Sequence, residues 1–332
     1  MKSLQLDRPG SRLLIFRNGK IGNTLMALGV AQALKSAFHE LRLDMVVDHV
    51  GLDLLQDDPR LGKLFVFERD SDSLASQWRL ARSLRRERYA ASIHCRTGVR
   101  NEILALLAGI PNRIGYRLKG SPQLLTCKHP KHNDRHVLAS LESLVQDGLG
   151  LDLRLERPRL HERPDAAQAA GQWLQEQGLA AGEYMVWHPA GQTSHGVERT
   201  LNWHAEAMVR LQQKLDLPVA IVGAGEEKSA ILRVLPEGVR VHPFFGQSVS
   251  KASSIIKNAR LFVGNDSGPA HLAEAWDVPK VVVYQDDPGN FVKWRPLDEG
   301  NALPIFAAEA DTDAAWAKIE AFAESRSKRS GA

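Results

Sequence analysis

A short polar stretch in the last third of the chain has the residues of an anion site. It reads Asp266-Ser267-Gly268-Pro269-Ala270-His271 and follows an apolar run, Arg260–Val263, that is typical of a short buried strand. Pro269 predicts that a helix begins here. A turn between a strand and a helix presents backbone N–H groups and the positive end of the helix dipole, and both favour a bound phosphate. The simpler alternative is an ordinary helix start capped by Asp266 or Ser267.

Two further segments combine glycine with polar residues near apolar runs. One is Ile21-Gly22-Asn23-Thr24-Leu25, and the other is His188-Pro189-Ala190-Gly191 followed by Arg199-Thr200-Leu201-Asn202-Trp203. In order and spacing, these segments and the Asp266–His271 stretch resemble those of the bacterial heptosyltransferase-like glycosyltransferases, glycosyltransferase family 9. The resemblance extends over nearly the whole chain and is strongest from residue 185 to residue 284.

Length and composition indicate a globular protein of two domains. The chain has 332 residues, of which 43% are hydrophobic and 25% charged, and its longest apolar runs are only long enough for strands. The first ten residues lack the apolar core of a secretory signal, so we expect a cytoplasmic protein. The two cysteines, Cys95 and Cys127, are too few for a disulfide framework.

The charge balance favours an anionic partner. The net charge is +4, but the chain has no nucleic-acid-binding motif and its basic residues are not interleaved with aromatic ones. Nucleic acid is therefore not expected as a partner. A phosphorylated glycolipid or oligosaccharide fits better, and a peripheral contact with the inner membrane would accompany such an acceptor.

Strand-like and helix-like runs alternate along both halves of the chain, which favours parallel α/β sheets. The strand-like runs are Arg12–Phe16, Leu43–Val47, Leu64–Phe67, Ala91–Cys95, Tyr184–His188, Val219–Val222, Val239–His242, Leu261–Val263 and Lys280–Tyr284. Helices are expected to begin at Thr24 after the first glycine segment and at His204 after the second.

The proline-containing segment 156–164 is expected to link a first domain, 1–155, to a second domain, 165–332. The family resemblance implies the GT-B architecture, in which two Rossmann-like doubly wound domains face each other across a cleft. It also implies that the first domain binds the acceptor and the second the nucleotide sugar. In the family the final helix returns to the first domain, and residues 312–325 could do so here.

A third glycine segment invites a dinucleotide-binding interpretation, which fails. In Gly223-Ala224-Gly225-Glu226-Glu227-Lys228 the third glycine of the dinucleotide motif is replaced by Lys228. The resemblance implies instead that an acidic residue at this turn holds the ribose of the donor nucleotide. Glu226 and Glu227 are both candidates.

The resemblance implies an inverting, metal-independent transfer of a heptose or related sugar from a nucleoside diphosphate to lipopolysaccharide core, O-antigen or another surface glycan. No cofactor is expected beyond the donor itself. Arg199 is the candidate cation for the charge that grows on the leaving diphosphate. The other donor-side candidates are Thr193, Ser194, Asp266 as a catalytic group, Ser267, Gly268 and His271.

The acceptor side departs from the family pattern at one residue. The family has Gly-Asp where this chain has Gly22-Asn23, and that aspartate is taken as the catalytic base. An amide cannot accept a proton at neutral pH. Three interpretations stay open: Asn23 only orients the acceptor hydroxyl, another base replaces it, or the chain is weakly active or inactive. The candidate replacement bases are Asp48, His49 and His94.

Arginines that follow the fourth strand-like run are candidates for the acceptor site. Their guanidinium groups could contact phosphate or carboxylate, but each could equally well be an ordinary charged residue of the surface. These candidates are Arg96, Arg100, Arg113 and Arg117. Two other functions are kept as alternatives. One is a nucleotide-sugar 2-epimerase, which also uses two such domains but needs no acceptor. The other is a non-catalytic nucleotide-sugar-binding partner, which the asparagine at position 23 would explain.

Overall fold

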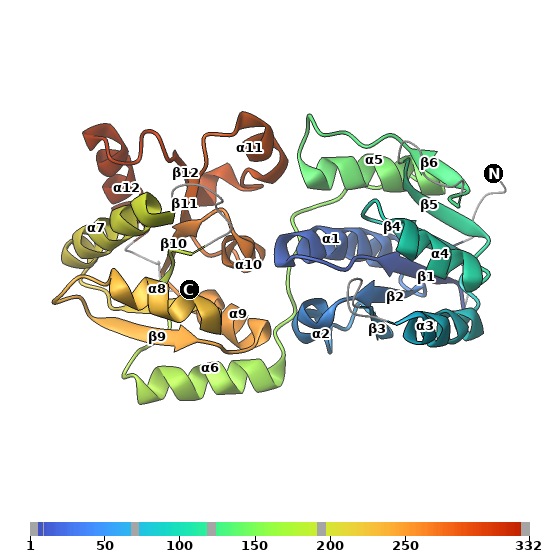
Figure 1. Cartoon of the computed structure of the whole chain (residues 1–332), viewed down its shortest axis with the longest axis horizontal. Coiled ribbons are helices and arrows are strands. Elements are labelled where there is room, and N and C mark those ends of the chain that lie inside the picture. Colours follow the sequence, from blue (N-terminus) through green and yellow to red (C-terminus); the bar gives the residue numbers. More distant parts are fainter. Residues whose placement is uncertain (1–5, 9, 68–72, 118–123, 191–196, 327–332) are drawn as a thin grey trace. The chain divides into compact units, whose positions relative to one another are not determined.

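The chain forms two compact units, residues 1–161 and residues 162–332 (Figure 1). The computed structural model describes residues 6–8, 10–67, 73–117, 124–190 and 197–326, without the side chains of residues 197–200. The boundary between the units falls inside the proline-containing segment 156–164. None of the described helices combines the length and the apolar character needed to cross a bilayer.

The first unit contains a six-stranded parallel sheet in the order β3-β2-β1-β4-β5-β6. This order is that of a doubly wound Rossmann fold, with the direction of winding reversed between β1 and β4. Its elements are β1 (Arg12–Phe16), α1 (Ile21–Ala37), β2 (Arg42–Val47), α2 (His49–Leu55), β3 (Leu64–Val66), α3 (Leu74–Glu87), β4 (Ala91–His94), α4 (Val99–Leu107), β5 (Asn112–Tyr116), β6 (Cys127–His129) and α5 (Val137–Leu149).

The second unit repeats this winding with the sheet order β12-β11-β10-β7-β8-β9. The reversal here lies between β7 and β10. Its elements are α6 (Pro164–Glu176), β7 (Met185–His188), α7 (Val197–Leu215), β8 (Val219–Gly223), a short 3₁₀ turn (Gly225–Glu227), α8 (Lys228–Arg233), β9 (Val241–Phe245), α9 (Val249–Lys257), β10 (Leu261–Asn265), α10 (Gly268–Ala275), β11 (Lys280–Tyr284), α11 (Pro288–Trp294), a second 3₁₀ turn (Glu299–Asn301), β12 (Ala302–Phe306) and α12 (Asp313–Ser325).

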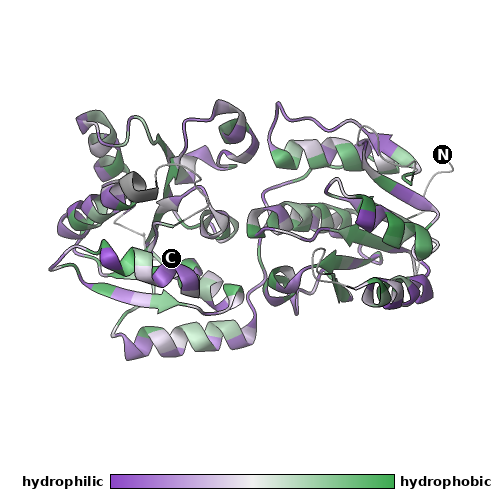
Figure 2. Cartoon of the chain, viewed as in Figure 1, coloured by the Kyte–Doolittle hydropathy of each residue, from purple (hydrophilic) through white to green (hydrophobic). Residues whose placement is uncertain are grey.

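The central strands are buried over almost their whole length, as parallel strands covered by helices on both faces must be. Figure 2 shows hydrophobic residues along the sheets and hydrophilic ones on outward-facing helices such as α3. The final helix, α12, packs against α7 and β12 of the second unit. There Trp316 stacks on Trp203 with ring centroids 5.5 Å apart. The return of residues 312–325 to the first domain, which the family resemblance implies, stays a prediction.

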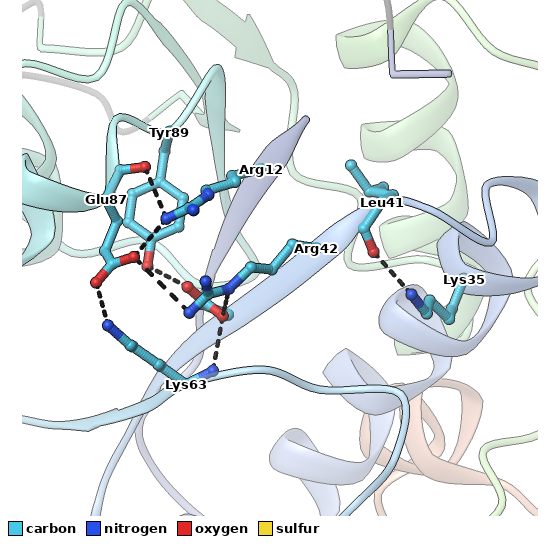
Figure 3. Close-up of polar contacts among 8 residues, drawn as sticks. Arg12, Lys35, Leu41, Arg42, Lys63, Glu87 and Tyr89 are labelled. Atoms are coloured by element: carbon cyan, nitrogen blue, oxygen red, sulfur yellow. Dashed lines mark hydrogen bonds and ion pairs between the residues drawn. The ribbon is translucent and has the colours of Figure 1, made fainter. Parts of the chain in front are cut away.

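A polar cluster closes the amino-terminal edge of the first sheet (Figure 3). The buried carboxylate of Asp44 accepts a hydrogen bond from Tyr89 Oη at 2.6 Å and pairs with Arg42 Nε at 3.2 Å. Glu87 pairs with Lys63 and, at 2.6 Å, with Arg12 Nη1. Arg12 and Arg42 are the first residues of β1 and β2, so these charges lie at the edge opposite to the strand ends where ligands bind in such folds.

Two helices begin earlier than the sequence indicated. α1 begins at Ile21, because the Asn23 N–H donates to the Lys20 carbonyl at 3.0 Å and closes a helical turn there. Gly22 and Asn23 therefore lie in the first turn of α1, and Lys20 rather than Asn23 occupies the N-cap position. α7 begins at Val197, so Arg199 lies in the first turn of this helix and not in a preceding loop.

Candidate functional site

The carboxyl ends of β7 and β10 meet where the winding of the second sheet reverses. His188 is the last residue of β7, and it pairs in register with Gly264 of β10. A Cβ atom on Gly264 would lie 2.7 Å from the His188 carbonyl oxygen, so glycine is required for this close approach. Reversal of winding leaves a crevice at the strand ends in such sheets. The polar stretch found in the sequence begins directly after β10.

A buried hydrogen-bond chain fixes the two strand ends to each other. Trp187 Nε1 donates to His204 Nδ1 at 2.9 Å, His204 Nε2 lies 3.0 Å from Asn265 Oδ1, and Asn265 Nδ2 donates to the Pro189 carbonyl at 2.7 Å. An indole N–H can only donate, so His204 is neutral and carries its proton on Nε2. Burial lowers the pKa of His204 to about 4, in agreement with this assignment.

Ser267 does not cap its own helix. It occupies the N-cap position of α10 in an extended conformation, but its side chain makes no capping hydrogen bond. Its hydroxyl Oγ lies instead 3.1 Å from His188 Nδ1. The expectation that Asp266 or Ser267 caps this helix is thus wrong, because His188 competes for the serine hydroxyl.

The start of α10 keeps the features of an anion site. Its first turn contains no acidic residue, and no side chain caps it. Its second residue, Pro269, has no N–H, but Gly268 and Ala270 present theirs at the positive end of the helix dipole. These groups lie directly after the carboxyl end of β10 and can hold one or more phosphate oxygens.

Glu227 joins this site through His188. Its Oε2 atom lies 3.6 Å from His188 Nε2 and accepts a hydrogen bond from the Ala224 N–H at 2.8 Å. The interaction with His188 lowers the pKa of Glu227, so this carboxylate is ionised at neutral pH. Glu226 is exposed on the same turn. Of the two acidic candidates, Glu227 is the one that lies beside the residues at the start of α10.

Asp266 lies in a less polar environment on the other side of Ser267. Its carboxylate accepts a hydrogen bond from Asn290 Nδ2 at 3.1 Å and lies 3.7 Å from His271 Nε2. Burial raises the pKa of Asp266 to about 6, which the contact with Asn290 only partly offsets. The His271 ring also packs against Trp294 of α11, with centroids 5.2 Å apart. Asp266, Ser267 and His271 are thus brought together as the spacing suggested.

Three donor-side candidates cannot be placed. Thr193 and Ser194 lie outside the described residues, and so does the side chain of Arg199, although its backbone is in α7. The roles assigned to these three residues stay predictions.

The winding of the first sheet reverses between β1 and β4, and Asn23 lies in the helix that follows β1. Asn23 is partly buried in the first turn of α1, and Gly22 is buried. The Asp48 carboxylate accepts hydrogen bonds from the Gly19 N–H at 2.8 Å and the Gly51 N–H at 2.7 Å. Both of its oxygens therefore hold the backbone: one caps α2 and the other secures the turn after β1.

The two histidine candidates differ in their surroundings. His94 is 1% exposed, its ring stacks on Phe16 with centroids 4.6 Å apart, and its Nε2 atom lies 3.1 Å from Ser92 Oγ. Burial lowers the pKa of His94 to about 3, so it is neutral and a very weak base. His49 is exposed as the first residue of α2.

The four acceptor-side arginines do not form one group. Arg96 Nη1 donates to the Asn18 carbonyl at 3.3 Å, which joins the end of β4 to the turn after β1. Arg113 bonds to backbone carbonyls, including that of Leu124 at 2.6 Å, and stabilises its own loop. Arg100 and Arg117 are exposed. Arg96 is the one of the four with a recorded contact to the β1–α1 turn in the described part of the chain.

Sequence reasoning missed Arg17, the residue that directly follows β1. It is only 7% exposed, and burial lowers the pKa of its guanidinium to about 10, so it stays charged at neutral pH. An arginine placed immediately after the apolar run of β1 was the signal that could have identified it. His204 and Asn265 were missed as well, because a single sequence does not reveal that they meet.

Comparison with known proteins gives consistent results along the chain. Residues 77–311 match the profile of glycosyltransferase family 9 (heptosyltransferase). The chain is 22% identical over 287 residues to lipooligosaccharide heptosyltransferase 2 of Haemophilus influenzae, covering 82% of each protein.

Solved structures share the fold over almost the full length. A family 9 glycosyltransferase from Veillonella parvula has a TM-score of 0.82 at 16% identity, covering 98% of this chain and 94% of that one. The ADP-heptose lipopolysaccharide heptosyltransferase II of E. coli has a TM-score of 0.78 at 18% identity, covering 96% and 98%. The α/β fold of two parallel-sheet domains is therefore the GT-B fold of these enzymes, as expected.

Proposed function

The chain belongs to glycosyltransferase family 9, and on that premise we propose that it transfers a heptose or a related sugar from a nucleoside diphosphate to a phosphorylated glycolipid or oligosaccharide. ADP-heptose is the proposed donor class, because the similar E. coli enzyme is named for it. Lipopolysaccharide core, O-antigen or another surface glycan is the proposed acceptor class. A glycolipid acceptor would lie in a membrane, so we propose a cytoplasmic enzyme in peripheral contact with the inner membrane.

The main support for this proposal is that the N-terminus of α10 has no capping side chain and lies beside the ionised carboxylate of Glu227. The N–H groups of Gly268 and Ala270 can bind the diphosphate, while Glu227 can accept hydrogen bonds from the two ribose hydroxyls. His188 lies between them, bonded to Ser267 and close to Glu227. A nucleoside diphosphate has both groups, an anion and a vicinal diol.

The chemical step is an in-line displacement at the anomeric carbon with inversion. Negative charge grows on the leaving diphosphate as the glycosidic bond breaks, and N–H groups already aimed at it stabilise that charge. Arg199 is the proposed additional cation, and Thr193 and Ser194 are proposed as further donors. With its pKa raised to about 6, Asp266 readily takes up a proton beside a bound diphosphate and can then donate a hydrogen bond to a phosphate oxygen. No step requires a metal ion.

Deprotonation of the acceptor must proceed without an aspartate at position 23. We propose that Asn23 orients the acceptor hydroxyl and that the proton passes late to solvent water, after bonding to the sugar has made the hydroxyl acidic. Asp48 is bonded through both oxygens to backbone N–H groups, and His94 is buried with a pKa of about 3. Both are poorly suited to replace the missing base.

The test is a screen of nucleotide sugars followed by an assay for transfer. ADP-, GDP-, UDP- and dTDP-sugars would be added to the protein and its unfolding temperature measured. A ligand at about 100 times its dissociation constant stabilises the folded state by about 2.7 kcal/mol. The stabilising donor would then be incubated with lipopolysaccharide-derived acceptors. Conversion of the sugar without acceptor would indicate an epimerase, and binding without turnover a non-catalytic protein. Either result would refute the proposal.

A further inference from the structure

Arg17 is a buried cation for which the described part of the chain provides no hydrogen-bond acceptor. The residue is 7% exposed at the carboxyl end of β1, and no hydrogen bond or ion pair of its guanidinium is found among the described residues. The nearby carboxylate of Asp48 is already bonded to the Gly19 and Gly51 N–H groups. An unpaired charge that is removed from water costs several kcal/mol. Among the described residues the charge of Asp48 offsets part of this cost, and a bound anion would supply the missing hydrogen bonds.

A second arginine lies beside the same turn. Arg96, at the carboxyl end of β4, donates from Nη1 to the Asn18 carbonyl at 3.3 Å. The same Nη1 atom would lie 3.7 Å from a Cβ atom on Gly19. Arg96 is close enough to Arg17 for its charge to lower the pKa of the Arg17 guanidinium. Two like charges thus lie close together, and the nearby carboxylate of Asp48 is bonded to backbone N–H groups and not to either guanidinium.

The backbone around the two arginines adds to the positive potential. The turn Arg17–Lys20 leads into α1, whose N-terminus has no capping side-chain hydrogen bond from its N-cap residue and whose first turn has no acidic residue. The side chain of Asn18 holds this turn in place, accepting from Asn101 Nδ2 at 3.1 Å and donating to the Phe67 carbonyl. The turn also lies at the reversal of winding between β1 and β4, where doubly wound sheets bind ligands.

We propose that Arg17 and Arg96 form a binding site for an oxyanion group, a phosphate or a carboxylate, at the carboxyl edge of the first sheet. On the basis of the proposed function, we assign this oxyanion group to the acceptor. The site would then position the acceptor through the acceptor's negative charge rather than through its sugar hydroxyls. Guanidinium groups bind such anions through two parallel hydrogen bonds, and lysine cannot replace this geometry.

The binding test does not depend on transfer activity. The whole chain would be prepared in a buffer free of oxyanions, and its unfolding temperature measured with increasing inorganic phosphate or, separately, acetate. Phosphate held at α10 stabilises wild type and an Arg17→Gln variant equally, so the difference between the two proteins isolates the Arg17 site. We expect the variant to bind the effective anion at least about tenfold more weakly at this site. Whichever anion distinguishes the two proteins identifies the group.

The same experiment separates binding from a structural role. Without oxyanions the Arg17→Gln variant should unfold at the same or a higher temperature than wild type, because it no longer buries an unpaired charge. Arg82→Gln, at an exposed position of α3, should respond to anions as wild type does. The proposed site is refuted if Arg17→Gln and wild type respond equally to anions. It is also refuted if the variant unfolds at a lower temperature than wild type without anions. If Arg17→Gln does not fold, Arg96→Gln is measured in its place. An anion response of Arg96→Gln as large as that of wild type would also refute the proposed site.

A kinetic measurement tests the assignment to the acceptor. Arg17→Gln should raise the KM for acceptor at least about tenfold while leaving the KM for donor unchanged. Unchanged acceptor KM together with lost anion binding would refute the assignment. If anion binding depends on Arg17 but no nucleotide sugar is ever transferred, the proposed function fails and the anion site remains.

Discussion

Ser267 Oγ lies 3.1 Å from His188 Nδ1, so the residue that begins α10 is bonded to the end of β7 and not to its own helix. This contact leaves the first N–H groups of α10 without a capping side chain. It also joins them to Glu227, whose carboxylate lies 3.6 Å from the other nitrogen of the same imidazole. Three strand ends, those of β7, β8 and β10, therefore contribute to one small polar site.

The first prediction concerns the carboxylate of this site. Glu227→Gln should weaken binding of the donor nucleotide about 10- to 100-fold, since a hydrogen bond to a charged group contributes about 1.5–3 kcal/mol. Glu226→Gln is the matched control, because Glu226 is the exposed neighbour on the same turn. Calorimetric titration with ADP measures both. Equal affinity of the two variants would show that the ribose is held elsewhere.

The second prediction concerns the helix start itself. Gly268→Val should reduce donor affinity by at least about tenfold, because a branched side chain would occupy the space over the first turn of α10 where a phosphate is expected. The circular dichroism spectrum should stay that of the wild type. A folded variant that binds ADP as the wild type does would mean that the diphosphate is bound elsewhere.

The third prediction follows from the raised pKa of Asp266. Its ordinary value is 3.8, and the folded value is about 6. The folded protein therefore holds the proton more tightly, and stability contributed by this group is lost as pH rises from about 4 to 6. Asp266→Asn removes the burial penalty of the ionised form, so it should raise the free energy of unfolding at pH 8 by about 1–3 kcal/mol.

The comparison at low pH is the internal control for Asp266. At pH 4 the wild-type carboxyl is already protonated in the folded state, so the variant and the wild type should differ little. Denaturant unfolding at both pH values measures the effect. A variant that is less stable than the wild type at pH 8 would show that the ionised carboxylate is stabilised by its neighbours.

The strands of both domains could be predicted well from the sequence where they are central and fully buried. The expected strands Arg12–Phe16 and Lys280–Tyr284 coincide with β1 and β11. Three strands were not expected: β5, β6 and β12. β6 and β12 lie at sheet edges. β6 is only three residues long, and the apolar run of β12 contains Pro304, which argues against a central strand.

The candidate site could be predicted only where its residues are close in sequence. Asp266, Ser267 and His271 lie within one strand–helix turn, and local chemistry indicates their arrangement. The contact of Glu227 with His188 depends on how β7 and β8 pair, which no local pattern reveals. In the sequence Arg17 differs from a surface charge only by its place directly after an apolar run, and the fold shows that it is buried.

The fourth prediction concerns metal dependence. Transfer should persist in EDTA, because backbone N–H groups and a basic side chain are proposed to neutralise the leaving diphosphate. Initial rates would be measured with and without EDTA, at donor concentrations that saturate the enzyme. Loss of turnover in EDTA that magnesium or manganese restores would mean that a metal ion shares this role.

The last prediction concerns Asn23, where the chain departs from the family pattern. Asn23→Asp should keep or raise the rate of transfer, because a carboxylate in the first turn of α1 would provide the proton acceptor that the amide cannot. General-base catalysis contributes about 10²–10⁴-fold, which sets the largest gain. Stability should change little or rise, since the first turn of α1 has no acidic residue and a negative charge there interacts well with the helix dipole. Asn23→Ala should lower the rate only modestly if Asn23 orients the hydroxyl. Single-turnover rates at saturating donor measure all three proteins. If Asn23→Asp binds donor but transfers nothing, the chemistry does not take place at the start of α1, and the base must be sought on another element.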